Sequence, residues 1–367
     1  MGIPEKIKAI QDEIHRTQIN KATEHHVGLL KAKIAKLKRE QETEQVKKSS
    51  KKQDGFDVKR TGDATVVFIG LPSVGKSTLL NRLTGSKSAI GAYQFTTLTV
   101  VPGVMNYRGA RIQVLDLPGI IKGASTGKGL GRRILSVARS ADIVLLVLDV
   151  FQPYHEDVLI NELGNIGIRL NQTPPNIVIE KSTTGGIAVA QQTKLKKMSE
   201  KLLKEILNVY GYTSARVVIR EDITSEQLID FINGNKTYAK GITILNKIDL
   251  VDDKFVKNVS KKLKTDFIPT SADSNKNINQ LKERIYNELN FIRVYLRPKG
   301  GETDFKEPLI VRNGNTVADV CNKLHRNMKK DFRFGLVWGK SVKFGGQRVG
   351  LNHILIDEDV LTVIKKR

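Results

Sequence analysis

Residues 65–83 read TVVFIGLPSVGKSTLLNRL, and this stretch decides the fold of the chain. Its first five residues are all β-branched or aromatic and predict a buried strand, while residues 77–83 continue with the spacing of a helix. The loop between them has a glycine at each end, Gly70 and Gly75, so its N–H groups can converge on an anion without opposition from a β-carbon. The positive end of the following helix adds to this attraction. The stretch therefore predicts a strand, a phosphate-binding loop (P-loop) and a helix.

Two side chains at the end of this loop indicate its chemistry. We expect Lys76 to bridge the β- and γ-phosphates of a nucleotide as a flexible point charge, and the Ser77 hydroxyl to coordinate Mg²⁺. The loop by itself does not separate a GTPase from an ATPase or a small-molecule kinase. That choice depends on a second motif.

The second motif is Asn246-Lys247-Ile248-Asp249, which directly follows the predicted buried strand 241–245. The Asp249 carboxylate can accept hydrogen bonds from N1–H and the N2 amino group of guanine, whereas adenine offers no matching pair of donors. We expect Asn246 to stabilise the loop and approach the major-groove edge of guanine, and the Lys247 stem to pack over the ring plane. The motif predicts a guanine nucleotide.

Three further stretches complete the predicted site. Asp116 ends a predicted strand and should hold Mg²⁺ through water, with the Gly119 N–H sensing the γ-phosphate. In the run 93–97, Thr97 is preferred over Thr96 as the switch residue that supplies a hydroxyl to Mg²⁺. The N–H near Ala272 can meet guanine O6. The predicted site comprises Gly70, Pro72, Ser73, Val74, Gly75, Lys76, Ser77, Thr78, Phe95, Thr96, Thr97, Asp116, Gly119, Asn246, Lys247, Asp249, Ser271 and Ala272. Its catalytic residues are Lys76, Thr97, Asp116 and Gly119, and its metal ligands are Ser77, Thr97 and Asp116.

The residue after Gly119 is Ile120, where many GTPases carry a glutamine that orients the attacking water. An isoleucine side chain cannot orient a water molecule. We therefore expect slow intrinsic hydrolysis that depends on another residue, a partner or a monovalent cation near the P-loop. The segment that follows contains Gly123, Gly127, Gly129 and Gly131 and is predicted to be a switch ordered by nucleotide.

The overall composition predicts the compartment of the protein and the chemistry of its partner. The longest apolar run, 143–150, is too short to cross a bilayer, and the N-terminus lacks the apolar core of a signal peptide. The single cysteine, Cys321, suits a reducing compartment. These features predict a cytoplasmic protein with no membrane partner. The formal charge of +23 predicts a polyanionic partner, RNA or a ribosome, with an anionic membrane surface as the alternative.

Four parts are expected along the chain. Residues 1–55 predict a basic helical domain and linker: a break at 20–23 gives a helical hairpin. Residues 62–292 predict a G domain, an α/β fold with a doubly wound, mostly parallel sheet. Because the chain between strands 142–150 and 241–246 exceeds one crossover helix, a small α/β subdomain is predicted within the G domain at 170–238. The exposed face of the hairpin's second helix is expected to carry Lys31, Lys33, Lys36, Lys38 and Arg39.

Finer elements are predicted in the last two parts. In the inserted subdomain, residues 177–179 and 187–190 are expected to form a hairpin through Gly185 and Gly186, followed by a helix and a strand. Residues 293–367 show short strands around one helix, 317–328, which predicts a compact α+β domain.

Several runs resemble the Obg-type GTPases, namely 70–77, 93–98 and 116–121. More narrowly, the runs 6–10 and 167–175 resemble the developmentally regulated GTP-binding (DRG) family, and the likeness extends nearly end to end. The resemblance implies a C-terminal TGS domain of ubiquitin-like β-grasp fold. Residues 331–334, 350–355 and 357–360 support that assignment.

The resemblance also implies association with translating ribosomes and GTP hydrolysis stimulated by potassium. Ser73 departs from the pattern, because some potassium-activated GTPases place an asparagine ligand there. Family members in eukaryotes have stabilising protein partners, and such a partner is a further candidate for this chain, which is otherwise expected to be a monomer.

The sequence thus predicts a Mg²⁺-dependent GTPase that switches on RNA or the ribosome. A metabolic phosphotransferase is the rival enzyme class, and the guanine motif argues against it. An RNA-binding or ribosome-assembly factor in which GTP is mainly a structural ligand is the rival binding class, and Ile120 keeps this alternative open.

Overall fold

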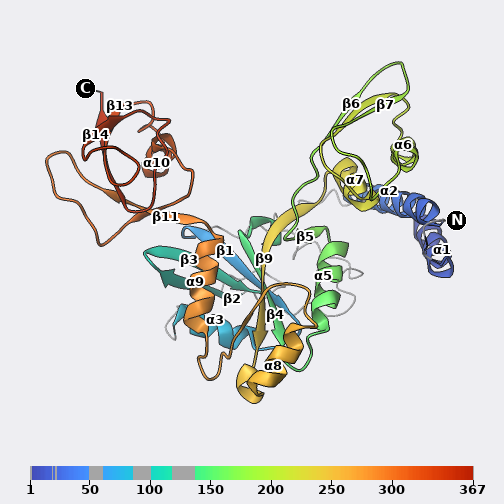
Figure 1. Cartoon of the computed structure of the whole chain (residues 1–367), viewed down its shortest axis with the longest axis horizontal. Coiled ribbons are helices and arrows are strands. Elements are labelled where there is room, and N and C mark those ends of the chain that lie inside the picture. Colours follow the sequence, from blue (N-terminus) through green and yellow to red (C-terminus); the bar gives the residue numbers. More distant parts are fainter. Residues whose placement is uncertain are drawn as a thin grey trace. The chain divides into compact units, whose positions relative to one another are not determined.

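The computed structural model describes residues 2–18, 20, 23–48, 61–85, 101–117 and 137–366. The chain forms two compact units: residues 1–55 with 171–238, and residues 56–170 with 239–367 (Figure 1). None of the helices within the described ranges is both long and apolar enough to span a membrane.

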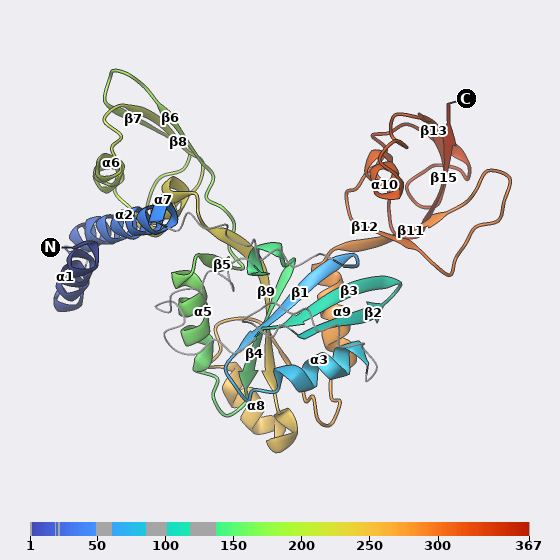
Figure 2. The same ribbon diagram turned by 180° about the vertical axis from the view of Figure 1, so that it is seen from behind.

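The second unit contains the G domain, built on a seven-stranded sheet (Figure 2). Its strand order is β10-β9-β4-β1-β3-β2, with β5 also paired to β9. All neighbours from β10 to β3 are parallel and β2 pairs antiparallel with β3, which confirms the predicted doubly wound, mostly parallel sheet. The strands are β1 (Ala64–Gly70), β2 (Val101–Tyr107), β3 (Ala110–Asp116), β4 (Ile143–Asp149), β5 (Ile168–Leu170), β9 (Thr237–Asn246) and β10 (Phe267–Pro269).

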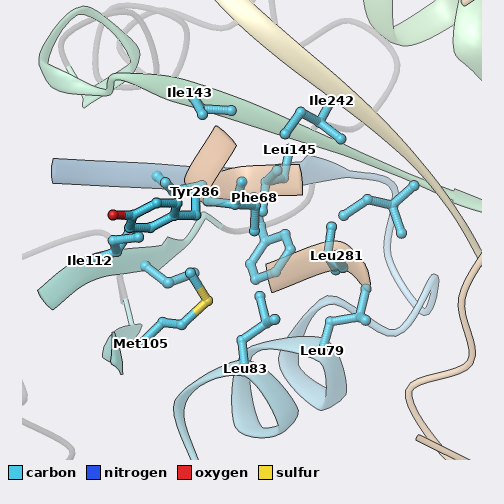
Figure 3. Packing of buried hydrophobic residues seen from close by; sticks show 14 of the residues in the cluster. Phe68, Leu79, Leu83, Met105, Ile112, Ile143, Leu145, Ile242, Leu281 and Tyr286 are labelled. Carbon is cyan, nitrogen blue, oxygen red and sulfur yellow. The ribbon is translucent and has the colours of Figure 1, made fainter. Parts of the chain in front are cut away.

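Both faces of this sheet are buried, as the apolar strands predict. Along β1, Val66 and Phe68 point to one side, where α3 and α9 pack, and Val67 and Ile69 to the other, where α5 and α8 pack. Figure 3 shows the first of these cores, with the Phe68 ring among side chains from α3, β2 and α9. The helices are α3 (Lys76–Thr84), α5 (His155–Asn165), α8 (Asp253–Ser260) and α9 (Ile278–Glu288), with a 3-10 turn η1 at Ile248–Leu250.

The first unit joins the N-terminal helices to the inserted subdomain. Helices α1 (Ile3–Arg16) and α2 (Glu24–Lys48) form the predicted hairpin, and the Thr23 N–H donates to the side chain of Asn20 at the break. Ala32 of α2 is fully buried in the core of the insert. The insert consists of β6 (Ile177–Lys181), β7 (Ile187–Gln191), α6 (Glu200–Val209), β8 (Ala215–Ile219) and α7 (Ser225–Asn233).

Two predictions for this unit are wrong. The strands β6 and β7 do not form a hairpin, because β8 lies between them, antiparallel to β6 and parallel to β7. Part of the expected exposed basic face of α2 is also directed at the insert, because α2 packs on α6 and α7. Lys31 pairs with Glu226, and the Lys36 ammonium donates to the Val209 carbonyl at 2.8 Å. Lys33 and Lys38 remain exposed, as does Arg39, whose guanidinium reaches the Ile232 carbonyl.

The C-terminal domain is a five-stranded sheet of order β12-β11-β15-β13-β14 packed against α10. The central strand β15 is parallel to its neighbour β11, and this mixed sheet with one helix confirms the predicted β-grasp domain. Helix α10 ends four residues earlier than expected, since His325 takes an extended conformation. The elements are β11 (Phe291–Leu296), β12 (Leu309–Arg312), α10 (Val317–Leu324), β13 (Phe332–Trp338), β14 (Gln347–Val349) and β15 (Asp359–Lys365).

This domain continues directly into the core of the G domain. Phe291 and Ile310 are buried in the same cluster as the residues of α3 and α9. Two ion pairs add to the junction: Arg312 with Asp142, and Lys323 with Asp63, the latter at 2.9 Å.

Candidate nucleotide-binding site

The P-loop lies at the carboxyl end of β1 and leads into α3. Ser73 and Gly75 both have positive φ, 63° and 92°, which turns the backbone tightly. A β-carbon at Gly75 would lie 2.3 Å from the side-chain nitrogen of Asn246, and one at Gly70 would lie 2.6 Å from the Val147 carbonyl oxygen. Close packing therefore requires glycine at both positions, and the positive φ is a second reason at Gly75.

The Lys76 side chain is folded over the loop. Its ammonium donates hydrogen bonds to the carbonyl oxygens of Gly70 at 3.1 Å and Leu71 at 2.8 Å, and the residue is only 8% exposed. Burial lowers the pKa of Lys76, an effect that the nearby Asp116 carboxylate opposes. A buried ammonium whose hydrogen bonds to described residues go to neutral carbonyls gains from an anion brought close to it.

Ser77 and Asp116 form the second polar pair of the phosphate end. The Ser77 hydroxyl donates to Asp116 Oδ2 at 2.7 Å, while Asp116 Oδ1 is buried and has no hydrogen-bond partner among the described residues. Burial raises the pKa of Asp116, opposed by the Ser77 bond and by Lys76. A hydroxyl and a carboxylate with an unpaired buried oxygen are oxygen ligands of the kind that Mg²⁺ prefers, so these residues fit the predicted metal.

The other predicted phosphate residues contribute mainly backbone. Val74 packs its side chain into the G-domain core, Pro72 and Ser73 are exposed, and Thr78 is half-buried in α3. The remaining predicted residues, Phe95, Thr96, Thr97 and Gly119, lie outside the described residues, as does Ile120.

Asn246 connects the two motifs of the site. It is 1% exposed, its Nδ2 donates to the Val74 carbonyl at 2.9 Å, and its Oδ1 accepts from the Ala272 N–H at 3.1 Å. The sequence predicted that Asn246 and the Ala272 N–H both contact guanine. In the structure, the Ala272 N–H instead donates to Asn246 Oδ1. Asn246 thus fastens the P-loop, the guanine motif and the loop after β10 together.

Two residues that the sequence did not indicate also fix the base end of the site, which consists of the guanine motif and the loop after β10. Asp149, at the end of β4, forms an ion pair with Lys247 at 2.8 Å, and its other oxygen accepts from the Phe151 N–H. Arg82 of α3 donates to the carbonyls of Ala272 at 2.8 Å and Asp273 at 2.9 Å. The sequence contained a signal for Asp149, because this residue is a single carboxylate at the end of the apolar strand 143–148. No feature of the sequence indicated the role of Arg82.

Lys247 and Asp249 occupy the turn after β9. Lys247 has a positive φ of 68°, and Asp249 follows in η1 with an exposed carboxylate that has no hydrogen bond or ion pair to another described residue. Ser271 is fully buried, and its hydroxyl accepts from the Ser274 N–H. The carboxylate predicted to recognise guanine is therefore available to a ligand.

Parallel strands bring all these segments to one edge of the sheet. The P-loop, Asp116, the guanine motif and the loop after β10 follow the carboxyl ends of β1, β3, β9 and β10, which is where nucleotides bind in doubly wound folds. A P-loop beside a guanine-reading turn defines the class: the protein is a P-loop GTPase.

Comparison with known proteins identifies the family. Residues 65–181 match the model described as 50S ribosome-binding GTPase, residues 184–291 the C-terminal region of the MMR_HSR1 domain, and residues 292–365 the TGS domain. An uncharacterized GTP-binding protein of Methanocaldococcus jannaschii is 50% identical, over all of this chain and 94% of its own length. The developmentally-regulated GTP-binding protein 2 homolog of Dictyostelium discoideum and protein 1 of Xenopus laevis are 46% and 45% identical over the full length of both chains. The chain belongs to the developmentally regulated GTP-binding protein family.

Proposed function

We propose that this protein hydrolyses GTP to GDP and phosphate with Mg²⁺, slowly by itself, and that the nucleotide state controls its binding to RNA or the ribosome. The observation that carries the hydrolytic part is the group formed by the buried Lys76 and Asp116 and the exposed Ser77 at the end of the P-loop, next to the guanine motif. Such a group binds a metal-complexed triphosphate, and the base is selected by Asp249.

The chain's own residues would act as follows. Ser77, Asp116 and the predicted Thr97 would hold Mg²⁺, which neutralises charge on the β- and γ-phosphates when bound. The Lys76 ammonium would exchange the Gly70 and Leu71 carbonyls for phosphate oxygens. The N–H groups of the P-loop and of Gly119 would stabilise negative charge in the transition state.

Ile120 limits the rate of this reaction. Since an isoleucine cannot orient the attacking water, the residual rate comes from positioning and electrostatics, and a monovalent cation such as K⁺ near the P-loop is a candidate for additional stimulation. The rival in which GTP is only a structural ligand predicts no hydrolysis at all.

Single-turnover hydrolysis in sodium and in potassium, with and without ribosomes, tests the enzymatic proposal. We expect measurable turnover that is faster in potassium. Asp249→Asn is the matched control, because it should lose GTP turnover and gain xanthosine triphosphate turnover, which a contaminating GTPase would not do. Absence of turnover under every condition would leave only the binding function.

The proposed partner, RNA or the ribosome, is inferred from the positive charge of the protein. The formal charge of +23 favours a polyanion, Lys33, Lys38 and Arg39 remain exposed on α2, and one matching family model is described as ribosome-binding. Co-sedimentation with ribosomes at graded salt is the test. Binding should weaken steeply with salt and should decrease for the triple variant Lys33→Gln, Lys38→Gln and Arg39→Gln, whereas salt-independent binding would contradict the electrostatic proposal.

A further inference from the structure

Arg82, in the last turn of α3, holds two successive peptide groups of the loop after β10. Its Nε donates to the Ala272 carbonyl at 2.8 Å and its Nη2 to the Asp273 carbonyl at 2.9 Å. Within the described part of the chain Arg82 forms no ion pair, so these two carbonyls are the groups that its guanidinium binds. The planar fork of an arginine suits such a double contact, because its N–H groups are fixed relative to one another.

Ala272 is held from both sides of its backbone. The residue is 2% exposed, its N–H donates to Asn246 Oδ1 at 3.1 Å, and its carbonyl accepts from Arg82. Asn246 therefore fixes the peptide group before Ala272, and Arg82 fixes the peptide group after it. A buried carbonyl without a partner is costly, so loss of the Arg82 side chain should favour a rotation of the peptide between residues 272 and 273.

This peptide also carries a hydrogen-bond donor, the N–H of Asp273. The described residues contain no cis peptide bond, and the C=O and N–H of a planar trans peptide point in opposite directions. By holding the Ala272 carbonyl, Arg82 therefore also fixes the direction of the Asp273 N–H, which points away from the guanidinium. This N–H donates to no other described residue, so it remains available to a ligand.

Guanine and adenine differ at the position that a donor in this loop would meet. Guanine carries an oxygen at C6, which accepts a hydrogen bond, whereas adenine carries an amino group there, which donates one. A backbone N–H fixed beside C6 therefore favours guanine and opposes adenine. The Asp249 carboxylate is expected to bind N1–H and the N2 amino group, so the loop and Asp249 would read different atoms of the base.

We propose that Arg82 is a positioning residue for base selectivity: by holding the carbonyls of Ala272 and Asp273, it keeps an N–H group of this loop directed at guanine O6. The proposal rests on the guanine nucleotide of the proposed function and adds a second determinant to Asp249. Helix α3 begins at Lys76 and contains Arg82, so one helix would connect the phosphate end of the site to the donor for O6.

Nucleoside diphosphates that differ only in the base test this role. Dissociation constants of the full-length protein with Mg²⁺ are measured for GDP, 6-thioguanosine diphosphate and inosine diphosphate. The thio analogue replaces O6 by sulfur, a weaker acceptor, and keeps both donors for Asp249, whereas the inosine nucleotide keeps O6 and lacks the N2 amino group. Arg82→Met should weaken binding of GDP and inosine diphosphate about fivefold each, and binding of the thio analogue less than about twofold.

The ratio of the affinities for GDP and the thio analogue is the decisive value, because an inactive fraction of a variant lowers both equally. Arg82→Lys keeps a charged donor on a stem of similar length, and its ratio should lie between those of the wild type and Arg82→Met. Arg284→Met is the matched control. It removes a partly exposed arginine of α9 that pairs with Asp266 and Glu288, and it should leave the ratio unchanged.

The outcomes separate this proposal from the proposed hydrolysis. An equal loss for GDP and the thio analogue in Arg82→Met would show that Arg82 only stabilises the loop, and the proposal would be overturned. A wild type that binds both nucleotides equally would overturn it as well, because O6 would then not be recognised. Neither result affects the hydrolytic proposal. Conversely, a lower ratio in Arg82→Met without any GTP turnover in the wild type would support the role of Arg82 and refute hydrolysis.

Discussion

The phosphate end and the base end of the nucleotide site differ in how their polar groups are satisfied. At the phosphate end, the Lys76 ammonium donates to two backbone carbonyls, Asp116 Oδ1 is buried without a hydrogen-bond partner in the described part of the chain, and burial shifts the pKa of both groups against their charged forms. At the base end, both polar atoms of the Asn246 amide are bonded and Lys247 is paired with Asp149.

This difference separates two ways of building a binding site. The phosphate end keeps charges that destabilise the unliganded protein and that a phosphate and a cation would relieve. The base end is assembled by bonds within the protein before any ligand arrives. Substitutions at the two ends should therefore change stability in opposite directions, although both weaken nucleotide binding.

The largest effect is expected at Asp249, whose carboxylate forms no hydrogen bond or ion pair with another described residue. Asp249→Asn should reduce GTP affinity by at least about 100-fold, near 3 kcal/mol, because an amide cannot accept both guanine donors. Xanthine nucleotides should bind better, and the melting temperature without nucleotide should not change. Competition binding with both nucleotides measures this, and unchanged GTP affinity would refute the assignment of Asp249.

The second largest effect is expected for Asn246→Ala, which removes the hydrogen bonds that connect the phosphate end to the base end. Losing two buried hydrogen bonds and leaving their partners unsatisfied should cost about 2 kcal/mol of stability, and nucleotide affinity should fall together with it. Denaturant unfolding without nucleotide and nucleotide titration give the two values. Asn287→Ala on the exposed side of α9 is the control. A variant that unfolds like the wild type would mean that the base end is not preassembled.

Asp116→Asn should have the opposite sign in stability. Removing a buried carboxylate whose charge is disfavoured should raise the stability of the nucleotide-free protein by about 1 kcal/mol, while the effect of Mg²⁺ on nucleotide affinity should be lost. Thermal unfolding with and without GDP and Mg²⁺ tests both parts. A destabilised variant would contradict the inference that the buried charge of Asp116 destabilises the nucleotide-free protein.

The same residue makes a pH-dependent prediction. Because the folded pKa of Asp116 is raised above its ordinary value of 3.8, its contribution to stability is fully present below that value and is lost as pH rises through the folded pKa. The stability advantage of Asp116→Asn over the wild type should therefore grow across this window and then level off. A constant difference over the whole range would show that the carboxylate is not desolvated.

The smallest effect is expected at Asp149. Asp149→Asn removes a partly exposed ion pair and should weaken GTP binding only a few-fold, about 0.5 kcal/mol, because Lys247 then loses its fixed position. Asp157→Asn, which breaks a more exposed pair with Lys264 in the same domain, should leave GTP affinity unchanged. Equal effects in the two variants would show that Asp149 acts through net charge alone.

Much of the fold was predictable because its signals are local. The buried strands, the two-helix N-terminus with its break at 20–23, and the short strands of the C-terminal domain follow from periodicity and from turn residues. The predicted hairpin between residues 177–179 and 187–190 failed because strand pairing depends on β8, which comes more than twenty residues later in the chain.

By itself the sequence determined the class of protein and the base it selects. The residues to which we assign these properties, in 70–77 and 246–249, form short contiguous motifs whose chemistry can be recognised from residue type and spacing. The tertiary structure alone decided what holds the motifs together. The contacts of Asn246 with Val74 and Ala272, of Arg82 with the loop after β10, and of Asp149 with Lys247 join segments that are distant along the chain. Such contacts leave no periodic or spacing signal in one sequence, because they depend on which strand ends the folded sheet brings to the same edge.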